Sequence, residues 1–379
     1  MLSHLKSGTR ALHTSTRKTV LYGWGQTQAL PLTKGHMDRI FNQPTLLRNE
    51  QDYALPKDEE ITQVATGWGH SLLSNSNKVY AFGLNQSGQL GTNKTKITMQ
   101  DPVKFVACGR EHSHIVTENQ DGTQLYSFGN DMYGQLGLGK NKNSNPGSLI
   151  AESQPTLVDF KEKIESITCG LDNTIFATGK QIFGMGWGAD GQLGQGFEDK
   201  NVPSPLSLEI EIKKLSSSTD YTFALGADGR VWTWGNSEYG QGIQGKIIDR
   251  ILEPFEVKVN DVVDVAAGGP FSVILTKDGQ VYTCGYGSLG LGKDVVQTLE
   301  ASVVTELSNK EIIKVFATTD YAAAISKCGK LYTWGLNGPS GRLGLGDNQH
   351  AFIPRLVKMD RQVIDVSLGT NHAIATCIE

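Results

Sequence analysis

A short signature, an aromatic residue followed by glycine, recurs along this chain about every 50 residues. It is found seven times, at intervals of 46 to 59 residues, with cysteine in place of the aromatic residue in one copy. Several copies continue into a Gly-Gln-Leu-Gly turn. A period near 50 residues is typical of blade-like units that stack against one another. The seven copies are Trp24-Gly25, Phe82-Gly83, Phe128-Gly129, Trp187-Gly188, Trp234-Gly235, Cys284-Gly285 and Trp334-Gly335.

A second signature, in its fullest form Gly-x-x-His, precedes each of the last six aromatic-glycine steps and occurs once more near the end of the chain. We interpret the glycine and histidine of the full Gly-x-x-His copies as structural residues, with partly buried histidines that tie neighbouring strands together. The residues assigned to this structural role are Gly67, His70, Gly109, His112, Gly369 and His372.

Between the two signatures, apolar residues alternate on both sides of a short polar turn. Asp228-Gly229 and Asp278-Gly279 are two such turns. Alternation around a two-residue turn of this kind predicts a β-hairpin, and Asp-Gly favours type I′ geometry. Each repeat is therefore expected to be antiparallel sheet.

These repeats predict an all-β fold, a seven-bladed β-propeller that spans residues 20–379. One blade buries too little apolar surface to be stable alone, and a closed ring removes most exposed sheet edges. The first aromatic-glycine strand (Val20 to Gly25) lacks its partner signature, and the last segment (Val363 to His372) lacks its aromatic-glycine strand. We therefore expect the N- and C-terminal strands to share one blade.

Residues 1–19 differ in composition from the rest of the chain. They hold four basic residues and seven Ser or Thr residues, and the first acidic residue is Asp38. This composition is typical of a mitochondrial transit peptide, and the stretch Arg10 to Ser15 resembles a processing signal that would leave Val20 at the mature terminus. The expected location is the mitochondrial matrix or the matrix face of the inner membrane.

Without residues 1–19 the chain has 31 basic and 39 acidic residues, a net charge of −8. That charge does not favour a protein that binds nucleic acid mainly by electrostatics. No run of 18 apolar residues is present, which argues against a transmembrane helix. Cys108 and Cys169 precede a glycine at the same repeat position and are expected to be core thiols in a reducing compartment.

Several motifs resemble catalytic or binding sites but are better explained by the repeat. Gly186 to Gly191 and Gly285 to Gly290 match GxGxxG, yet no helical pattern follows to bind a pyrophosphate. His112 and His114 have the HxH spacing of a metal site, but no carboxylate or thiol is spaced along the sequence to complete one. We therefore predict no cofactor, no metal site, and no hydrolase or redox centre.

The paired signatures resemble the repeats of the regulator of chromosome condensation family, whose founding member is the exchange factor of the Ran GTPase. The likeness covers residues 20–379. The segments around Trp187, Trp234 and Tyr286 are most similar to the mitochondrial branch of the family, and the leader-like residues 1–19 agree with that assignment.

The resemblance implies an exchange face with acidic residues, a histidine and an inserted wedge. Asp131 and Asp172 match the positions of two such acids, so they are the candidate residues for contact with a GTPase. The long insertion between Gly139 and Lys161 falls where the family's wedge lies. The histidine is not retained, because Phe271 occupies its position in the fifth signature.

The function implied by the resemblance is that of a mitochondrial propeller scaffold with guanine nucleotide exchange activity. The mitochondrial branch is associated with the dynamin-like fusion GTPase of the inner membrane, which also implies a possible peripheral association with that membrane. The alternative is a role in maturation of mitochondrial large-subunit rRNA or ribosome assembly, with rRNA or assembly factors as partners. Lys140, Lys142, Lys161 and Lys163 flank the insertion and are a candidate basic patch for that role.

Overall fold

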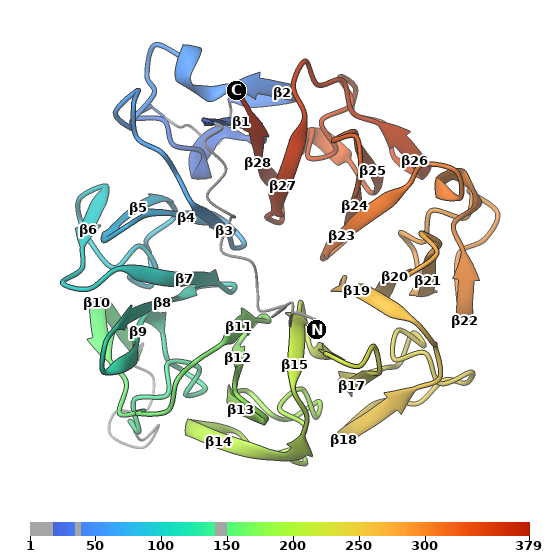
Figure 1. Ribbon diagram of the computed structural model, residues 1–379, viewed down its shortest axis with the longest axis horizontal. Helices are drawn as coiled ribbons and strands as arrows, with labels where there is room; N and C mark the ends of the chain where they lie inside the picture. The colour runs from blue at the N-terminus through green and yellow to red at the C-terminus, as the bar shows by residue number, and fades with distance from the viewer. Residues whose placement is uncertain (1–17, 35–38, 141–149) are drawn as a thin grey trace, which may run out of the picture.

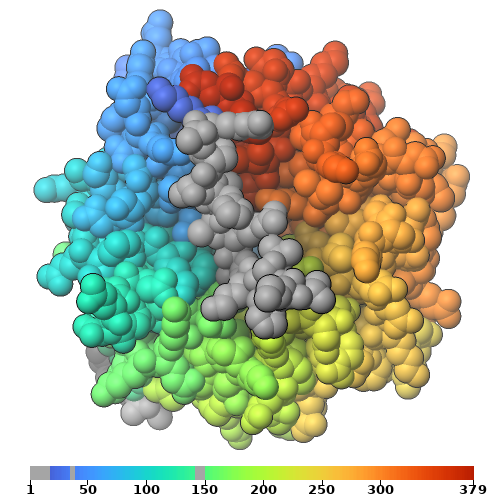
Figure 2. Space-filling view, viewed as in Figure 1, coloured from blue at the N-terminus to red at the C-terminus, as the bar shows by residue number. Residues whose placement is uncertain are grey.

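Seven four-stranded antiparallel sheets are arranged as blades around a central axis in the computed structural model, which describes residues 18–34, 39–140 and 150–379 (Figure 1). The blades follow one another around the ring in chain order, as the continuous colour sequence in Figure 2 also shows. The all-β, seven-bladed propeller expected from the sequence is confirmed.

Six blades are each built from four consecutive strands, with the first strand at the axis and the fourth at the outside. Their strands are β3 (Gln63–Thr66), β4 (His70–Asn75), β5 (Lys78–Gly83) and β6 (Lys96–Thr98); β7 (Val103–Cys108), β8 (His112–Asn119), β9 (Gly122–Asn130) and β10 (Ala151–Leu157); β11 (Ser166–Cys169), β12 (Asn173–Thr178), β13 (Gln181–Gly186) and β14 (Lys200–Glu209); β15 (Ile212–Ser217), β16 (Tyr221–Gly226), β17 (Val231–Asn236) and β18 (Arg250–Val257); β19 (Val262–Ala267), β20 (Phe271–Thr276), β21 (Val281–Tyr286) and β22 (Gln297–Val303); and β23 (Ile312–Thr318), β24 (Tyr321–Ser326), β25 (Leu331–Gly335) and β26 (Ala351–Leu356).

The seventh blade joins the two ends of the chain. Its strand order is β2 (Ile40–Leu46), β1 (Thr19–Gln26), β28 (His372–Ile378) and β27 (Val363–Leu368). β1 and β28 pair without interruption from Thr19↔Ile378 to Gly25↔His372. The predicted closure of the ring by shared terminal strands is confirmed.

Short 3₁₀ helices connect some strands, and they lie at Thr27–Ala29 (η1), Leu47–Asn49 (η2), Thr305–Leu307 (η4) and Gly338–Ser340 (η5). In the described part of the chain, no helix has the length and hydropathy needed to cross a membrane.

The two signatures pack against each other across the gaps between blades. The indole Nε1 of Trp234 donates a hydrogen bond to the carbonyl of Gln192, in the Gly-Gln-Leu-Gly turn of the preceding blade, at 3.0 Å. Trp24 makes the same bond to the carbonyl of Arg342 at 2.8 Å. A Cβ on Gly194, the last residue of the Gly191–Gly194 turn, would approach the Trp234 ring to 3.2 Å. The turn therefore ends in glycine because φ is +67° there and because Leu206 and the Trp234 ring leave little room for a Cβ.

The structure places one copy of the aromatic-glycine signature two residues before the predicted Trp187-Gly188. In the blade that contains β13, Gly186 pairs with Asn173, as Gly235 pairs with Tyr221 in the next blade. The structural equivalent of the aromatic residue is therefore Met185, which is fully buried, and not Trp187. A flexible thioether fills the space that an aromatic ring fills elsewhere.

The hairpin turns are not of the predicted type I′, which needs positive φ at both central residues. Among the described residues, Gly279 has φ +83° whereas Asp278 has no positive φ. The Gly279 amide donates to the Thr276 carbonyl at 2.9 Å, and the Thr276 amide donates to the Gln280 carbonyl at 3.0 Å. This pattern is a type I turn followed by a glycine bulge, the usual three-residue hairpin loop.

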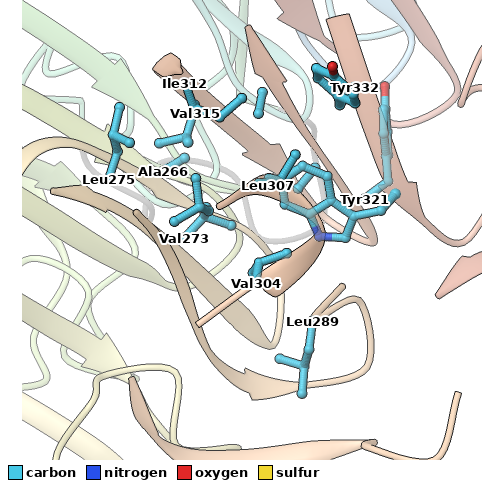
Figure 3. Close-up of a cluster of buried hydrophobic side chains, with 14 of the residues drawn as sticks. Ala266, Val273, Leu275, Leu289, Val304, Leu307, Ile312, Val315, Tyr321 and Tyr332 are labelled. Atoms are coloured by element: carbon cyan, nitrogen blue, oxygen red, sulfur yellow. The ribbon is translucent and has the colours of Figure 1, made fainter. Parts of the chain in front are cut away.

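The core consists of apolar clusters that lie between neighbouring blades. Figure 3 shows one of them, in which Val273 and Leu275 of β20 lie near Ile312 and Val315 of β23. Tyr321 belongs to the same cluster and is fully buried. Because each blade buries its faces against two neighbours, stability is shared along the ring as in other repeat proteins.

Candidate functional site

The loops that carry both signatures lie on one face of the ring, which we call the signature face. It is formed by the loops between the first and second strands and between the third and fourth strands of each blade. Since strands alternate in direction, the hairpins at Asp228-Gly229 and Asp278-Gly279 lie on the opposite, hairpin face. Both acidic residues that match the family's exchange positions belong to the signature face.

The repeat histidines tie strands of neighbouring blades together, and they are fully buried where partial burial was expected. His70 Nε2 lies 2.9 Å from Ser113 Oγ of the next blade, and His372 Nε2 lies 2.8 Å from Ser71 Oγ of the blade after it in the ring. Burial lowers the pKa of His70 to about 3 and that of His372 to about 4. These imidazoles are therefore neutral at physiological pH and have a structural role.

In the Gly-x-x-His copies, the first residue is glycine because the imidazole of the histidine lies over its Cα. A Cβ on Gly67 would lie 2.5 Å from the His70 ring, and a Cβ on Gly369 would lie 2.3 Å from the His372 ring. No real Cβ makes contacts this short, so the structural assignment of these glycines has a direct steric cause.

Asp131 is buried in the loop that follows β9, with 3% of its surface exposed. Its Oδ1 accepts a hydrogen bond from the Leu136 amide at 2.9 Å. Asn85 makes the same bond to the Leu90 amide in the preceding blade, at 3.0 Å. Burial raises the pKa of Asp131 to about 6, against the effect of that amide. The carboxylate thus stabilises the Gly-Gln-Leu-Gly turn.

Asp172 lies in the loop between β11 and β12 and forms an ion pair with Arg110 of the preceding blade. Only 7% of the Asp172 side chain is exposed, whereas 35% of the Arg110 side chain is exposed. Gln135 Nε2 donates a second hydrogen bond to the carboxylate at 3.4 Å. Burial raises the pKa of Asp172, and the nearby guanidinium opposes that shift.

Asp172 belongs to a larger group of carboxylates that we call the acidic arc, which consists of Glu111, Asp172, Asp190, Asp220 and Glu238. Its centre is Asp220, in the loop between β15 and β16. Burial raises the pKa of Asp220 to about 6, with further contributions from the negative charges of Asp190, Asp172 and Glu238. Among the described residues, no side chain or amide donates a hydrogen bond to the Asp220 carboxylate.

Sequence reasoning did not select Asp220, although a signal was present. Glu111, Asp172 and Asp220 occupy the third position of three successive Gly-x-x-His-type signatures. The same position on neighbouring blades must bring these side chains together. Asp190 and Glu238 come from loops between the third and fourth strands. Only the fold places them beside the loops between the first and second strands, which carry the other three carboxylates.

Exposed apolar side chains accompany the acidic arc on the signature face. Trp68 is 41% exposed and Met132 is 44% exposed. The Arg110 guanidinium lies 5.9 Å from the centre of the Trp68 ring. Tyr239 and Tyr286 are 40% and 44% exposed, with ring centres 5.7 Å apart. Aromatic and arginine side chains of this kind are common at protein interfaces.

In the insertion between Gly139 and Lys161, the structure describes residues 140 and 150–160, and residues 141–149 lie outside the described part of the chain. Its described part forms β10, the outer strand of its blade. Of the four lysines proposed as a basic patch, Lys140 pairs with Glu152, and Lys163 lies 2.8 Å from Glu118. Lys142 lies outside the described residues.

Phe271, which replaces the family histidine, is fully buried and packs in the same core cluster as Ala322. The side chain at this signature position is buried in all seven copies, whatever its type. They are His70, His112, Asn173, Tyr221, Phe271, Tyr321 and His372.

The structure also brings Cys169 beside His112 and His114, which the spacing along the sequence did not reveal. One ligand atom of each lies within 4.8 Å of the others. All five cysteines lie in the described part of the chain and are free thiols.

Comparison with known proteins agrees with this architecture. Two family profiles described as the regulator of chromosome condensation (RCC1) repeat match the chain, one at residues 76–116, 123–177, 228–275 and 328–376, the other at 61–89, 212–241 and 262–290. The crystal structure of human WBSCR16 superposes with a TM-score of 0.81 and 27% identity, over 96% of this chain and 100% of that chain. Yeast RCC1 (Prp20) bound to Kap60 superposes with a TM-score of 0.79 at 20% identity, over 100% and 94%.

Among curated proteins, the human RCC1-like G exchanging factor-like protein is 30% identical over 221 residues, which is 50% of this chain and 46% of the relative. The ultraviolet-B receptor UVR8 of Arabidopsis thaliana is 31% identical over 234 residues, 57% and 51% of the two chains. The matches thus span about half the length of these relatives.

Seven antiparallel blades with paired signatures define a propeller that carries both signature loops of each blade on one face. The repeat matches cover more than half of that propeller, and the chain belongs to the regulator of chromosome condensation repeat family.

Proposed function

We propose that this protein binds a GTPase through the acidic arc and the exposed apolar side chains around it, and accelerates the loss of bound nucleotide. The observation that carries the proposal is the acidic arc, in which Asp220 lies near Asp190, Asp172 and Glu238; burial and these negative charges raise the pKa of Asp220 to about 6, and the nearby Arg110 guanidinium opposes the shift. A cation supplied by a partner would relieve that repulsion. The P-loop lysine and Mg²⁺ are the cations that hold nucleotide phosphates in a GTPase, so competition for them weakens nucleotide binding.

Related proteins support a GTPase as the class of partner. The human relative carries the name RCC1-like G exchanging factor-like protein, and the yeast propeller Prp20p was studied for its binding to Gsp1p and histones. We assign the partner to the mitochondrial dynamin-like GTPases of the inner membrane, on the likeness to the mitochondrial branch. Asp131 supports the site indirectly, because it fixes the loop that presents Met132.

Nucleotide release tests this function. The wild-type chain is expected to accelerate release of labelled GDP from a mitochondrial dynamin-like GTPase, and Asp220→Asn is expected to reduce that acceleration at least tenfold. Asp121→Asn is the matched control, since Asp121 is an exposed acid on the hairpin face. Because Asp131 caps a turn, the Asp131→Ala, Asp172→Ala variant needs a parallel measurement of its melting temperature.

The outcomes separate the alternatives. No acceleration by the wild type on any mitochondrial GTPase rejects exchange, and copurification of large-subunit rRNA would then favour ribosome assembly. Equal acceleration by wild type and Asp220→Asn rejects only the acidic arc as the contact. The described lysines of the candidate basic patch already include two that are paired with glutamates, so the structure adds no support for direct rRNA binding.

We also propose that residues 1–19 direct the protein to mitochondria, with Val20 at the mature terminus. Residues 1–17 lie outside the described part of the chain. Cleavage before Val20 would keep the pairing of β1 with β28 from Val20↔Cys377 to Gly25↔His372. Terminal sequencing of the imported protein is expected to begin at or near Val20, and a mature chain that begins at Met1 would contradict the assignment.

A further inference from the structure

Two histidines and a cysteine from neighbouring blades meet beside the central channel. His112 and His114 lie on β8, and Cys169 ends β11. One ring nitrogen of each histidine and the Cys169 Sγ lie within 4.8 Å of one another. Both histidines are fully buried, while Cys169 lines a central cavity of about 240 Å³. Cys169 is thus the member of the cluster that borders the cavity.

His114 is an exception within the repeat. The equivalent residue of the second strand is apolar in each of the other six blades, where it contributes to the core. A buried imidazole in such a position costs free energy unless its nitrogens have partners, and here both ring nitrogens face hydroxyl groups. The six equivalents are Leu72, Ile175, Phe223, Val273, Ala323 and Ile374.

The three side chains converge on one point, which is marked by the hydroxyl of Thr174. Its Oγ1 lies 2.8 Å from His114 Nε2, 3.2 Å from His112 Nε2 and 4.0 Å from Cys169 Sγ. On the other side of the His114 ring, Nδ1 lies 2.9 Å from Ser127 Oγ. A hydrogen bond to the far nitrogen fixes the orientation of an imidazole, as is usual for histidines that bind metals.

We propose that His112, His114 and Cys169 bind a zinc ion. Two imidazole nitrogens and one thiolate are typical zinc ligands, and a water molecule from the cavity or the Thr174 hydroxyl can take the fourth position. Tetrahedral zinc with such ligands has donor atoms roughly 3.3–3.8 Å apart, so the three donors need to move only slightly. The Zn–S bond forms as the Cys169 thiol loses its proton to water; neither imidazole loses a proton to solvent.

Metal binding to the full chain tests the site. After treatment with a chelator, the wild type is expected to bind one Zn²⁺ per chain in competition with a chromophoric chelator. Its Co²⁺ form should show the near-ultraviolet band of a thiolate ligand. His114→Leu, which copies Leu72 of the preceding blade, and Cys169→Ser should each weaken zinc binding at least tenfold, and Cys169→Ser should abolish the thiolate band.

Cys328→Ser is the matched control, because Cys328 is an exposed thiol on the hairpin face, and it should bind zinc like the wild type. Circular dichroism confirms that each variant is folded before titration. Equal zinc affinity of the wild type, His114→Leu and Cys169→Ser would overturn the proposal, as would loss of the thiolate band in Cys328→Ser. In either case the cluster is only a hydrogen-bonded contact between blades.

Discussion

Each histidine at the fourth signature position faces a hydroxyl of the second residue in the next blade's second strand. His70 faces a hydroxyl, that of Ser113, at 2.9 Å. Where Phe271 replaces the histidine, the residue in the equivalent place is Ala322, and both belong to one apolar cluster. The replacement of the family histidine is therefore accompanied by loss of the hydroxyl that would serve it.

Phe271→His tests this matching. The variant buries an imidazole with no hydroxyl to pair with, so we expect its free energy of unfolding to fall by about 2 kcal/mol. Adding Ala322→Ser should restore about 1 kcal/mol. Denaturant unfolding of the two single variants and the double variant measures the coupling, and a double variant no more stable than Phe271→His would contradict the pairing.

His372 predicts a specific sensitivity to acid. Burial lowers its pKa to about 4 in the folded protein, whereas an unfolded chain has a histidine pKa of about 6.5. The unfolded state therefore binds the proton more readily, and the stability from neutral His372 is present above pH 6.5 and lost as pH falls toward 4. At pH 5 the loss is about 2 kcal/mol.

The comparison variant is His372→Asn, because Asn173 holds the same signature position in another blade. The stability difference between the wild type and His372→Asn should shrink by about 2 kcal/mol between pH 7 and pH 5. Titrating groups that do not interact with His372 cancel in this difference, whereas His70 is coupled to His372 by charge repulsion. A difference that does not change with pH would show that the imidazole is not buried in neutral form.

At the scale of single elements, the hairpin loop at Asp278-Gly279 places one residue, Gly279, in the left-handed backbone region. Gly279 has φ +83°, and a Cβ there would meet no atom within 4 Å, so its replacement tests backbone conformation alone. Gly279→Ala should cost about 1–2 kcal/mol, and Gly279→Asn should cost less because asparagine tolerates this region. Asp278→Gly should bring no gain in denaturant unfolding, whereas a type I′ turn would be stabilised by it.

The strands, the hairpins and the number of blades could be predicted because the same sequence pattern recurs in each repeat. The misplaced copy at Trp187 shows the limit of that approach. The sequence pattern looks for an aromatic residue before glycine, whereas the fold requires only a buried side chain before a glycine of positive φ, which Met185 and Gly186 provide. The residue that occupies the aromatic position is set by which backbone residues pair between the second and third strands. Residue types alone do not reveal that pairing.

The candidate site was predictable only in part, for a related reason. Asp172 could be found from its motif, but the clustering of Asp220 with Asp190 and Glu238 arises from loops of different blades. Cys169 joins His112 and His114 in the same way. Contacts between blades are not encoded in any local spacing, so they appear only when the ring is closed.

For the whole molecule, closure depends on the last two strands. Deletion of residues 363–379 removes β27 and β28 and leaves β1 paired only with β2. We expect the truncated chain to aggregate, because it exposes a sheet edge and the apolar side chains beside it. Coexpression of residues 363–379 as a separate segment should recover soluble protein, as judged by size-exclusion chromatography. A truncated chain that is soluble alone, with an unchanged melting temperature, would contradict this arrangement.

The shared blade also means that β1 must wait during synthesis until its partner β28 has been made. β1 leaves the ribosome first and β28 leaves it last, since these strands begin at Thr19 and end at Ile378. At cellular elongation rates the interval between them is about 20–70 s. Throughout that time the nascent chain carries an edge whose partner has not yet been made. An unpaired strand edge can pair with other chains, so the nascent protein is open to aggregation along β1 until β28 has been made.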